Sequence, residues 1–359
     1  MEVSQISELF TTVKSNVIGE YKVNFIRNFD QFNTYSDNKI YIVDNRLLNL
    51  YKIELKNFLN PSRLISIEAK EESKTLNYIY PIIKELLHLG VRKDSTLVAV
   101  GGGVTQDIVA FISSILFRGI KWEFYPTTLL AQCDSCIGSK SSINFEGYKN
   151  LLGTFLPPTE IFIYPNFLNT LDEKDIKSGI GEMSHYFLGK KQSKIFELFE
   201  NYEKILKDRS LLIKYIKSSL SIKKEIIEID EFDENKRHIF NYGHTFGHAL
   251  ESVTNYKISH GQAVTIGINI ANYVSLKKNL IDIIKFNEIL ELTKINFPSY
   301  DFKSFEIKDY MSALSKDKKN KGNYLGCILI DQEHKLEKYF IDINDDFKTL
   351  IKEFFNHYV

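Results

Sequence analysis

The feature that most constrains the fold of this 359-residue chain is an alternation of short apolar runs with amphipathic segments in its first third. Apolar runs of strand length lie at 40–44, 63–69 and 95–104, and helical patterns lie at 71–90 and 105–117. Strands that alternate with helices in this way form a parallel sheet with helices on its faces. The run IYIVD is apolar on both faces, as a buried parallel strand is.

The strand that runs into three glycines and then a helix is the first candidate binding feature. Gly101, Gly102 and Gly103 lie between STLVAV and the helical segment TQDIVAFISSILF. Glycine lets the backbone approach an oxyanion, and a helix N-terminus supplies N–H donors and a positive dipole end. The pattern is not GxGxxG, and a tight strand-to-helix link explains it equally well. Asp44, at the end of an earlier strand, could bind ribose hydroxyls or end that strand in solvent.

Histidines on one helix face, with a third histidine nearby, indicate a candidate metal site. His244 and His248 are four residues apart in a segment that can be helical, and His260 begins a second helix. Two or three imidazoles and one carboxylate would form an open zinc site, whereas helix histidines satisfied by backbone or solvent are the alternative. Glu182 lies in an apolar helical setting, where glutamate is rare unless it is paired or bound to a metal.

A segment rich in small residues follows the predicted sheet strands. Charged and amide residues stand there among serines and glycines, namely Asp134, Lys140, Lys149 and Asn150. This composition suits a crowded phosphate or cofactor pocket, with a solvated loop as the alternative. The CxxC formed by Cys133 and Cys136 has no second cysteine pair nearby, so we expect no redox or zinc role for it.

Composition limits the class of partners and the cellular compartment. Lys plus Arg and Asp plus Glu balance at 46 each, so no net field attracts nucleic acid or an anionic membrane. Three cysteines and no signal-peptide pattern predict a cytoplasmic protein without disulfides. From about residue 171 the sequence consists of long Lys-, Glu- and Ile-rich amphipathic segments, which predict helices up to the C-terminus.

The order of several motifs resembles that of the 3-dehydroquinate synthases, a family of sugar-phosphate cyclases. The motifs are GGGVTQD, FRG, PTTLLAQCDS, IGSK, YKNLLG, GIGE, NYGHTFGHA and SHG, together with the spacing from Lys223 to Arg237. The resemblance implies an α/β, Rossmann-like NAD-binding domain over residues 1–170. It also implies an all-α domain over residues 171–359 that binds zinc and substrate, an active site between the domains, and a homodimer.

The resemblance also implies roles for individual residues. Glu182, His244 and His260 correspond to the ligands of Zn²⁺, or of Co²⁺, and His248 corresponds to a phosphate-side histidine instead of a ligand. The substrate-contacting positions are Asp134, Lys140, Asn150, Lys223, Arg237 and Asn241, with Arg118 reaching the phosphate from the partner subunit. Lys318, or its neighbour Lys319, corresponds to a lysine that closes on the phosphate. The NAD-contacting positions are Asp44, Glu72, Lys74, Gly101, Gly102, Gly103, Val104, Asp107, Thr127, Thr128, Lys140, Lys149 and the run from Phe167 to Thr170.

Two residues depart from the family pattern. His185 stands where the family has a lysine, and Gln262 stands where it has a glutamate. His185 lies one helical turn from Glu182, so it could bind a substrate hydroxyl, support the zinc ligands or pack without a chemical role. The first of these roles is our prediction.

The implied reaction converts 3-deoxy-D-arabino-heptulosonate 7-phosphate to 3-dehydroquinate and phosphate, with NAD reduced and regenerated in each turnover. Lys223 and Arg237 favour this substrate, because a substrate without a carboxylate would leave both charges unmatched. The alternatives are a sister cyclase that forms a cyclitol from a sugar phosphate such as sedoheptulose 7-phosphate, a polyol dehydrogenase, and a silent structural paralogue.

Overall fold

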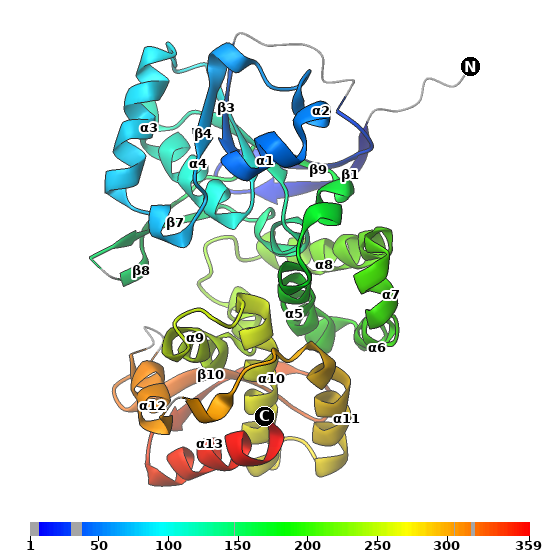
Figure 1. The fold of residues 1–359 in the computed structure, drawn as a ribbon. Helices are drawn as coiled ribbons and strands as arrows, with labels where there is room; N and C mark the ends of the chain where they lie inside the picture. Colours follow the sequence, from blue (N-terminus) through cyan, green and yellow to red (C-terminus); the bar gives the residue numbers. More distant parts are fainter. Residues whose placement is uncertain (1–6, 30–37, 147, 305, 317–319) are drawn as a thin grey trace. The chain divides into compact units, whose positions relative to one another are not determined.

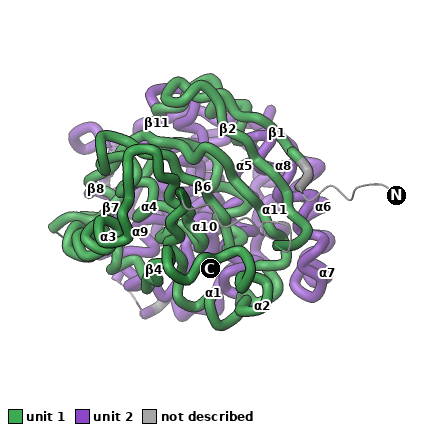
Figure 2. The backbone as a smooth tube through the Cα atoms, turned by 90° about the horizontal axis from the view of Figure 1, so that it is seen from above, with its two compact units in different colours: residues 1–171, 223–232 green, residues 172–222, 233–359 purple. Residues whose placement is uncertain are grey.

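The computed structural model describes residues 7–29, 38–146, 148–304, 306–316 and 320–359, and the chain divides into two compact units. The first unit comprises residues 1–171 and 223–232, and the second comprises residues 172–222 and 233–359, coloured separately in Figure 2. The segment 223–232, which the sequence assigns to the helical domain, is therefore part of the first unit.

A seven-stranded sheet forms the centre of the first unit (Figure 1). Its strand order is β1-β2-β9-β6-β5-β3-β4. The pairings β2–β9, β9–β6, β6–β5, β5–β3 and β3–β4 are parallel, as the strand–helix alternation predicts, whereas β1 pairs antiparallel with β2. The strands are β1 Ser7–Ser15, β2 Gly19–Ile26, β3 Lys39–Asp44, β4 Leu64–Ile67, β5 Thr96–Gly101, β6 Lys121–Pro126 and β9 Glu160–Ile163.

Helices cover this sheet, and a two-stranded hairpin extends from it. The helices are α1 Asn45–Leu50, α2 Lys52–Leu55, α3 Leu76–His88 and α4 Gly103–Ile115. The hairpin consists of β7 Lys140–Phe145 and β8 Tyr148–Phe155, and β7 lies against α4 (Figure 1). The small-residue segment is therefore a π-helical turn, Ala131–Ser135, followed by this hairpin.

An aromatic cluster fills the first unit beneath α1 and α2. The rings of Phe29, Phe58, Tyr125 and Phe162 contact one another, and all are less than 8% exposed. Burial of large rings is the main favourable term for a core of this kind. It fixes the sheet whose carboxyl ends carry Asp44 and Gly101.

The second unit is built around α10, His260–Lys277, whose residues from Gly261 to Ser275 are all buried. A helix that is buried on every side forms the centre of a domain, and α5 Glu173–Lys190, α9 His244–Val253, α11 Ile283–Thr293 and α13 Asp345–Tyr358 pack against it. The other helices are α6 Gln192–Glu200, α7 Tyr202–Lys207, α12 Ile307–Ser315 and α8 Leu212–Ile227, whose residues from 223 onward belong to the first unit. None of the described helices has both the length and the apolar character that a bilayer crossing requires.

The second unit is helical as predicted, but it is not all-α. The strands β10 Tyr324–Ile330 and β11 Leu336–Asp342 form an antiparallel hairpin that packs on α10. Six of the seven β10 residues are buried. A short apolar run of this length, after a glycine and before a polar turn, is the signal that could have predicted the strand.

Candidate metal centre and cofactor site

Three potential metal ligands come together from three helices of the second unit. Glu182 lies within α5, and His244 and His260 are the first residues of α9 and α10. The Nε2 atom of His244 is 3.4 Å from Oε1 of Glu182, and the Nε2 atom of His260 is 3.3 Å from Oε2. One ligand atom from each of the three residues lies within 4.8 Å of the other two. The structure thus brings the three predicted ligands close enough to share one ion.

Each of these ligands adjoins a glycine at which two helices touch. A Cβ atom on Gly181 would lie 2.0 Å from the carbonyl oxygen of Gly261, and one on Gly261 would lie 1.7 Å from the carbonyl oxygen of Ser178. Gly243 has a φ of 80°, and a Cβ atom there would lie 2.8 Å from a carbonyl oxygen of α10. A side chain at any of these positions would separate the helices, so the glycines allow the ligands to converge.

The outer nitrogens of both imidazoles face hydrogen-bond acceptors. The Nδ1 atom of His244 is 3.3 Å from the carbonyl oxygen of Tyr242, and that of His260 is 3.0 Å from Oε2 of Glu251. In the tautomer that carries its proton on Nδ1, each imidazole has its Nε2 lone pair directed at Glu182. A divalent cation between these lone pairs and the carboxylate would stabilise the arrangement.

The carboxylate at the centre of the cluster is buried and ionised. Glu182 is 4% exposed, and its Oε2 atom accepts no hydrogen bond from the part of the chain that the structure describes. Burial alone would raise the pKa of Glu182, but the imidazoles of His244, His185 and His260 outweigh burial and hold the pKa well below its ordinary value. A buried carboxylate faced by two imidazole nitrogens fits a cation, and this ligand set suits Zn²⁺ or Co²⁺.

His248 lies beside this cluster and is exposed to solvent. Its ring centre is 5.5 Å from that of His244 and 5.6 Å from that of His260. His248, Glu251 and His260 form a second group whose ligand atoms lie within 4.8 Å of one another. Glu251 was not singled out in the sequence, although it shares the helix of the two predicted histidines and could have been recognised there.

His185 is almost completely buried, with its side chain 1% exposed. Its Nδ1 atom is 3.7 Å from Oε1 of Glu182, and its ring centre is 3.9 Å from that of Tyr186 and 5.1 Å from that of His244. This burial favours the two roles in which the ring supports the metal ligand or packs. Contact with a substrate hydroxyl stays a prediction.

The side chain of Gln262 uses both ends of its amide. The hydroxyl of Ser259 donates to its Oε1 atom at 2.9 Å, and its Nε2 atom donates to the carbonyl oxygen of Asn296 at 3.1 Å. Gln262 is 5% exposed. A carboxylate here would place an oxygen against that carbonyl group, so the surroundings of this position suit an amide.

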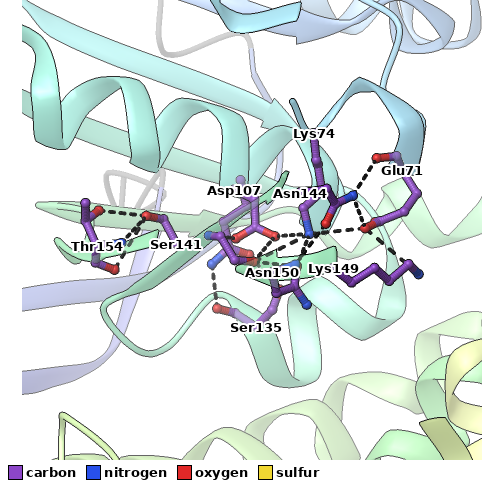
Figure 3. Close-up of polar contacts among 11 residues, drawn as sticks. Glu71, Lys74, Asp107, Ser135, Ser141, Asn144, Lys149, Asn150 and Thr154 are labelled. Atoms are coloured by element: carbon purple, nitrogen blue, oxygen red, sulfur yellow. Dashed lines mark hydrogen bonds and ion pairs between the residues drawn. The ribbon is translucent and has the colours of Figure 1, made fainter. Parts of the chain in front are cut away.

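In the first unit, predicted site residues form a connected polar network (Figure 3). The Nζ atom of Lys74 lies 2.8 Å from Oδ2 of Asp107 and donates to Oδ1 of Asn150 at 2.8 Å. Ser142 donates to the same two side chains, through its backbone N–H to Asp107 and through its hydroxyl to Asn150. Burial raises the pKa of Asp107, and Lys74 and Ser142 offset part of that rise. The network fixes the β7–β8 hairpin to the start of α4.

Asn144 joins this network although the sequence did not single it out. Its Oδ1 atom accepts a hydrogen bond from the backbone N–H of Asn150 at 2.9 Å, and its Nδ2 atom donates to Oε1 of Glu71 at 3.0 Å. Its backbone N–H donates to the carbonyl oxygen of Lys74 at 2.6 Å. Asparagine is disfavoured in strands, so an asparagine within β7 is the signal that could have identified it.

Glu71, and not the predicted Glu72, faces the cations of the network. Its Oε1 atom lies 3.5 Å from Nζ of Lys74 and 4.0 Å from Nζ of Lys149, whereas Glu72 is exposed. A contact between Glu72 and a cofactor stays a prediction.

The three glycines at the end of β5 differ in what surrounds them. A Cβ atom on Gly101 would lie 2.2 Å from Oγ1 of Thr105, and one on Gly102 would lie 2.9 Å from Cγ2 of Thr128. At Gly103 the nearest atom would be Oγ of Ser135 at 4.0 Å. Packing inside the unit therefore requires the first two glycines, whereas the third leaves open space at the first turn of α4.

Asp134 and Lys223, both predicted to bind substrate, are paired with each other. The Nζ atom of Lys223 lies 2.8 Å from Oδ1 of Asp134 and also donates to its carbonyl oxygen. Lys223 is 5% exposed. Its charge is therefore matched within the first unit, and the inference that a substrate without a carboxylate would leave it unmatched is wrong for this residue.

Other predicted cofactor residues have structural partners in the first unit. Asp44 caps α1 and forms an ion pair with Arg46 at 2.7 Å. Phe167 is 1% exposed within the aromatic core, so any contact it makes with a cofactor must come from its main chain. The hydroxyl of Thr170 lies 2.7 Å from that of Tyr51.

The remaining predicted residues are dispersed over both units. Thr127 is buried, Thr128 and Val104 are partly buried, and Lys140, the first residue of β7, is exposed. Arg118 is exposed and has a φ of 60°. Arg237 and Asn241 lie in the 3₁₀ turn Lys236–Asn241 that precedes α9. Lys318 and Lys319 lie outside the described residues.

Comparison with known proteins covers most of the chain. Residues 64–178 match the family described as 3-dehydroquinate synthase N-terminal, and residues 179–320 match 3-dehydroquinate synthase C-terminal. The 3-dehydroquinate synthase of Clostridium tetani is 36% identical over 344 residues, which are 91% of this chain and 90% of that protein. The enzyme of the same name from Dictyoglomus turgidum is 39% identical over 288 residues, 79% of each chain.

Solved structures share the fold. A 2-deoxy-scyllo-inosose synthase complexed with carbaglucose-6-phosphate, NAD⁺ and Co²⁺ has a TM-score of 0.85 at 24% identity, covering 97% of this chain and 99% of that one. A 2-epi-5-epi-valiolone synthase from Streptomyces hygroscopicus with NAD⁺ and Zn²⁺ bound has a TM-score of 0.79 at 22% identity, covering 93% and 97%. The predicted fold class, a parallel α/β domain followed by a helical domain, is confirmed.

Proposed function

Because this chain belongs to the 3-dehydroquinate synthase family, we propose that it converts 3-deoxy-D-arabino-heptulosonate 7-phosphate to 3-dehydroquinate and phosphate. The observation that carries the proposal is the pair of imidazole Nε2 atoms facing the two oxygens of the buried Glu182. Two imidazole nitrogens and one carboxylate that converge in this way form the ligand set of a catalytic divalent ion.

The helical domain, residues 172–222 and 233–359, would hold the ion through Glu182, His244 and His260. Three protein ligands leave coordination positions open, as catalytic zinc sites do. Zn²⁺ or Co²⁺ at this place would act as a Lewis acid toward a substrate oxygen. The acceptors beside the two Nδ1 atoms would orient the imidazole ligands. A proton on each Nδ1 leaves the Nε2 lone pair for the ion.

The N-terminal domain, residues 1–170, would hold NAD over the first turn of α4. Gly103 supports this assignment, because it leaves open space beside free N–H groups at the start of a helix. NAD would take a hydride from the substrate and return it later in the same turnover. We assign the surrounding polar residues, including Asp44, Glu72, Lys74, Asp107, Thr127, Thr128 and Lys149, to its contacts.

The substrate phosphate and carboxylate would be held by separate cations. From the family resemblance we assign the phosphate to Lys140, Asn150, His248 and Lys318, and the carboxylate to Lys223 and Arg237. We assign Asp134, Asn241 and His185 to further substrate contacts. Release of phosphate requires its negative charge to be stabilised, which lysine and histidine side chains can do. The ammonium group of Lys223 has three N–H donors, and it contacts Asp134 in the structure. It could therefore keep a hydrogen bond to Asp134 while it donates another to the substrate carboxylate.

We propose a homodimer, in which Arg118 serves the phosphate site of the second copy. Arg118 is exposed as the last residue of the 3₁₀ turn Leu116–Arg118 that follows α4, where a side chain can extend from the protein surface. Sedimentation at several concentrations would test the dimer. Mixing Arg118→Ala protein with inactive His248→Ala protein would then restore activity in heterodimers if the arginine acts across the interface.

A phosphate-release assay tests the reaction itself. The protein, loaded with Zn²⁺ or Co²⁺ and NAD, is given heptulosonate 7-phosphate or sedoheptulose 7-phosphate, and free phosphate and NADH are followed together. Phosphate from the first substrate without accumulation of NADH is the expected result. Release from sedoheptulose 7-phosphate alone would favour the cyclitol-forming alternative, and accumulation of NADH would favour a dehydrogenase. The cyclitol alternative is included in the test because His185 stands where the family resemblance predicts a lysine.

A further inference from the structure

Glu251 holds the outer nitrogen of one proposed metal ligand. Its Oε2 atom is 3.0 Å from Nδ1 of His260, and the Glu251 side chain is 13% exposed. Glu251 lies in α9, whereas His260 begins α10, so the contact links two helices that pack against each other. The imidazole of His260 therefore lies between two carboxylates, with Glu182 on its Nε2 side and Glu251 on its Nδ1 side.

His244 and His260 differ in the acceptor that their Nδ1 atoms face. The Nδ1 atom of His244 faces a backbone carbonyl oxygen at 3.3 Å, which is a neutral acceptor. The Nδ1 atom of His260 faces a charged carboxylate at a shorter distance. A carboxylate on the outer nitrogen fixes the tautomer and makes the inner nitrogen a stronger ligand. His260 is 31% exposed compared with 12% for His244, so it is the ligand that most needs such a restraint.

The second group, His248, Glu251 and His260, offers an alternative position for an ion. An ion there would take Nδ1 of His260, which would leave its proton on Nε2, facing Glu182. One neutral imidazole carries one proton, so the two arrangements exclude each other. The first arrangement is favoured because Glu182 is 4% exposed and its Oε2 atom accepts no hydrogen bond within the described part of the chain. His248, in contrast, is exposed.

From these contacts we propose that Glu251 is a positioning residue that sets the affinity of the metal centre through His260, without being a ligand itself. The proposal rests on the proposed function, in that Glu182, His244 and His260 hold the ion. Glu251 would accept a hydrogen bond from the proton on Nδ1 of His260, which leaves the Nε2 lone pair free to coordinate the ion. Loss of such a partner in other metal sites lowers affinity by about 10- to 100-fold.

Titration of metal-free protein with Co²⁺ tests the proposal without measuring turnover. Affinity is measured by competition with a chelator, and the visible absorption of the bound ion reports its ligands. Glu251→Ala should weaken Co²⁺ binding by about 10- to 100-fold while keeping the wild-type band positions. Glu251→Gln should lose less, because its amide oxygen still accepts from Nδ1. Glu288→Ala, which removes an exposed glutamate of α11, is the matched control and should bind as the wild type does.

Two further variants separate the outcomes. His260→Ala and Glu182→Gln should lose the Co²⁺ band, which would show that the proposed centre is correct. If they lose it while Glu251→Ala binds with unchanged affinity, the role of Glu251 is overturned and the proposed function stands. If Glu251→Ala changes the band positions and His248→Ala weakens binding equally, Glu251 is a ligand of the second group, and the positioning role is again overturned. Wild-type binding by His260→Ala and Glu182→Gln would overturn the centre itself. Circular dichroism of each metal-free variant checks folding, and Glu251→Gln serves if Glu251→Ala does not fold.

Discussion

Gly181 and Gly261 approach so closely that a Cβ atom on Gly181 would lie 2.0 Å from the carbonyl oxygen of Gly261. The first glycine precedes Glu182 and the second follows His260, so the contact sets the separation of α5 and α10 beside two proposed metal ligands. The motifs GIGE and SHG therefore each combine a ligand with the helix contact that positions it.

Gly261→Ala should destabilise the protein and weaken metal binding together. Its Cβ atom would lie 1.7 Å from the backbone oxygen of Ser178, which cannot rotate away, so the helices must separate. We expect a loss of about 1–3 kcal/mol in the free energy of unfolding, measured by urea denaturation. Gly103→Ala is the control, because its new Cβ atom would meet its nearest atom at 4.0 Å. Unchanged stability and Co²⁺ affinity in Gly261→Ala would show that this helix contact does not set the site.

Gly103→Val should weaken NAD binding and leave folding intact. The open space at Gly103 would be filled by a branched side chain at the first turn of α4, where a phosphate would need to approach the backbone. Isothermal titration calorimetry should show about a tenfold or greater loss of affinity, which corresponds to about 1.4 kcal/mol. Comparable NAD affinity in this variant would place the cofactor elsewhere.

Gln262→Glu should destabilise the second unit at neutral pH, although the family resemblance predicts a glutamate here. The new carboxylate would face the carbonyl oxygen of Asn296 where the amide now donates a hydrogen bond. A buried, unmatched polar contact of this kind costs about 1–3 kcal/mol. Urea denaturation of the variant and the wild type gives the difference in the free energy of unfolding. Gln262→Met removes the hydrogen bond without adding a charge, so it separates loss of the bond from repulsion between the carboxylate and the carbonyl oxygen. A more stable Gln262→Glu protein would contradict the assigned hydrogen bond.

The thiol of Cys136 should make stability fall at alkaline pH. Burial raises the pKa of Cys136 to about 12, whereas an unfolded thiol titrates near about pH 8.5. The folded state therefore binds more protons than the unfolded state between these values, and its stability decreases as pH rises through them. The decrease approaches about 1.4 kcal/mol per pH unit from this group. Cys136→Ala should show a correspondingly smaller slope in urea denaturation, and an identical slope would contradict the shift.

Asn144→Ala should impair catalysis through the β7–β8 hairpin while leaving the global fold in place. Its side chain joins Glu71 to the backbone of Asn150, a predicted substrate residue whose φ is 52°. Loss of these bonds should lower kcat/KM by about 10-fold or more, since misplacement of a substrate contact slows the reaction. Asn323→Ala, on an exposed turn of the second unit, is the control. Wild-type kcat/KM in Asn144→Ala would show that the hairpin is positioned by other contacts.

The sequence predicts strands and helices that arise from a local pattern of residues. It does not predict side-chain contacts between residues that are distant in the sequence. The strand–glycine–helix pattern predicted β5 and α4 correctly, because the order of apolar residues and glycines along the sequence indicates a buried strand and the start of a helix. Glu182 could be singled out because its charge conflicts with its apolar neighbours. The pairing of Asp134 with Lys223 could not be predicted, since these residues are 89 positions apart. Asn144 and Glu251 were missed because an asparagine or glutamate acquires its role from the partner it meets.

Three connections join the two units, at residues 171–172, 222–223 and 232–233. The returning segment 223–232 is fixed to the first unit by Glu231, which accepts hydrogen bonds from the hydroxyl of Ser15 and the backbone N–H of Asn16. Phe232 also packs edge-on against Phe155. A ribosome must therefore synthesise the chain as far as Phe232 before the first unit can complete its contacts. A fragment cut at residue 171 would lack these contacts, so the first unit depends on a segment that the C-terminal half of the chain supplies.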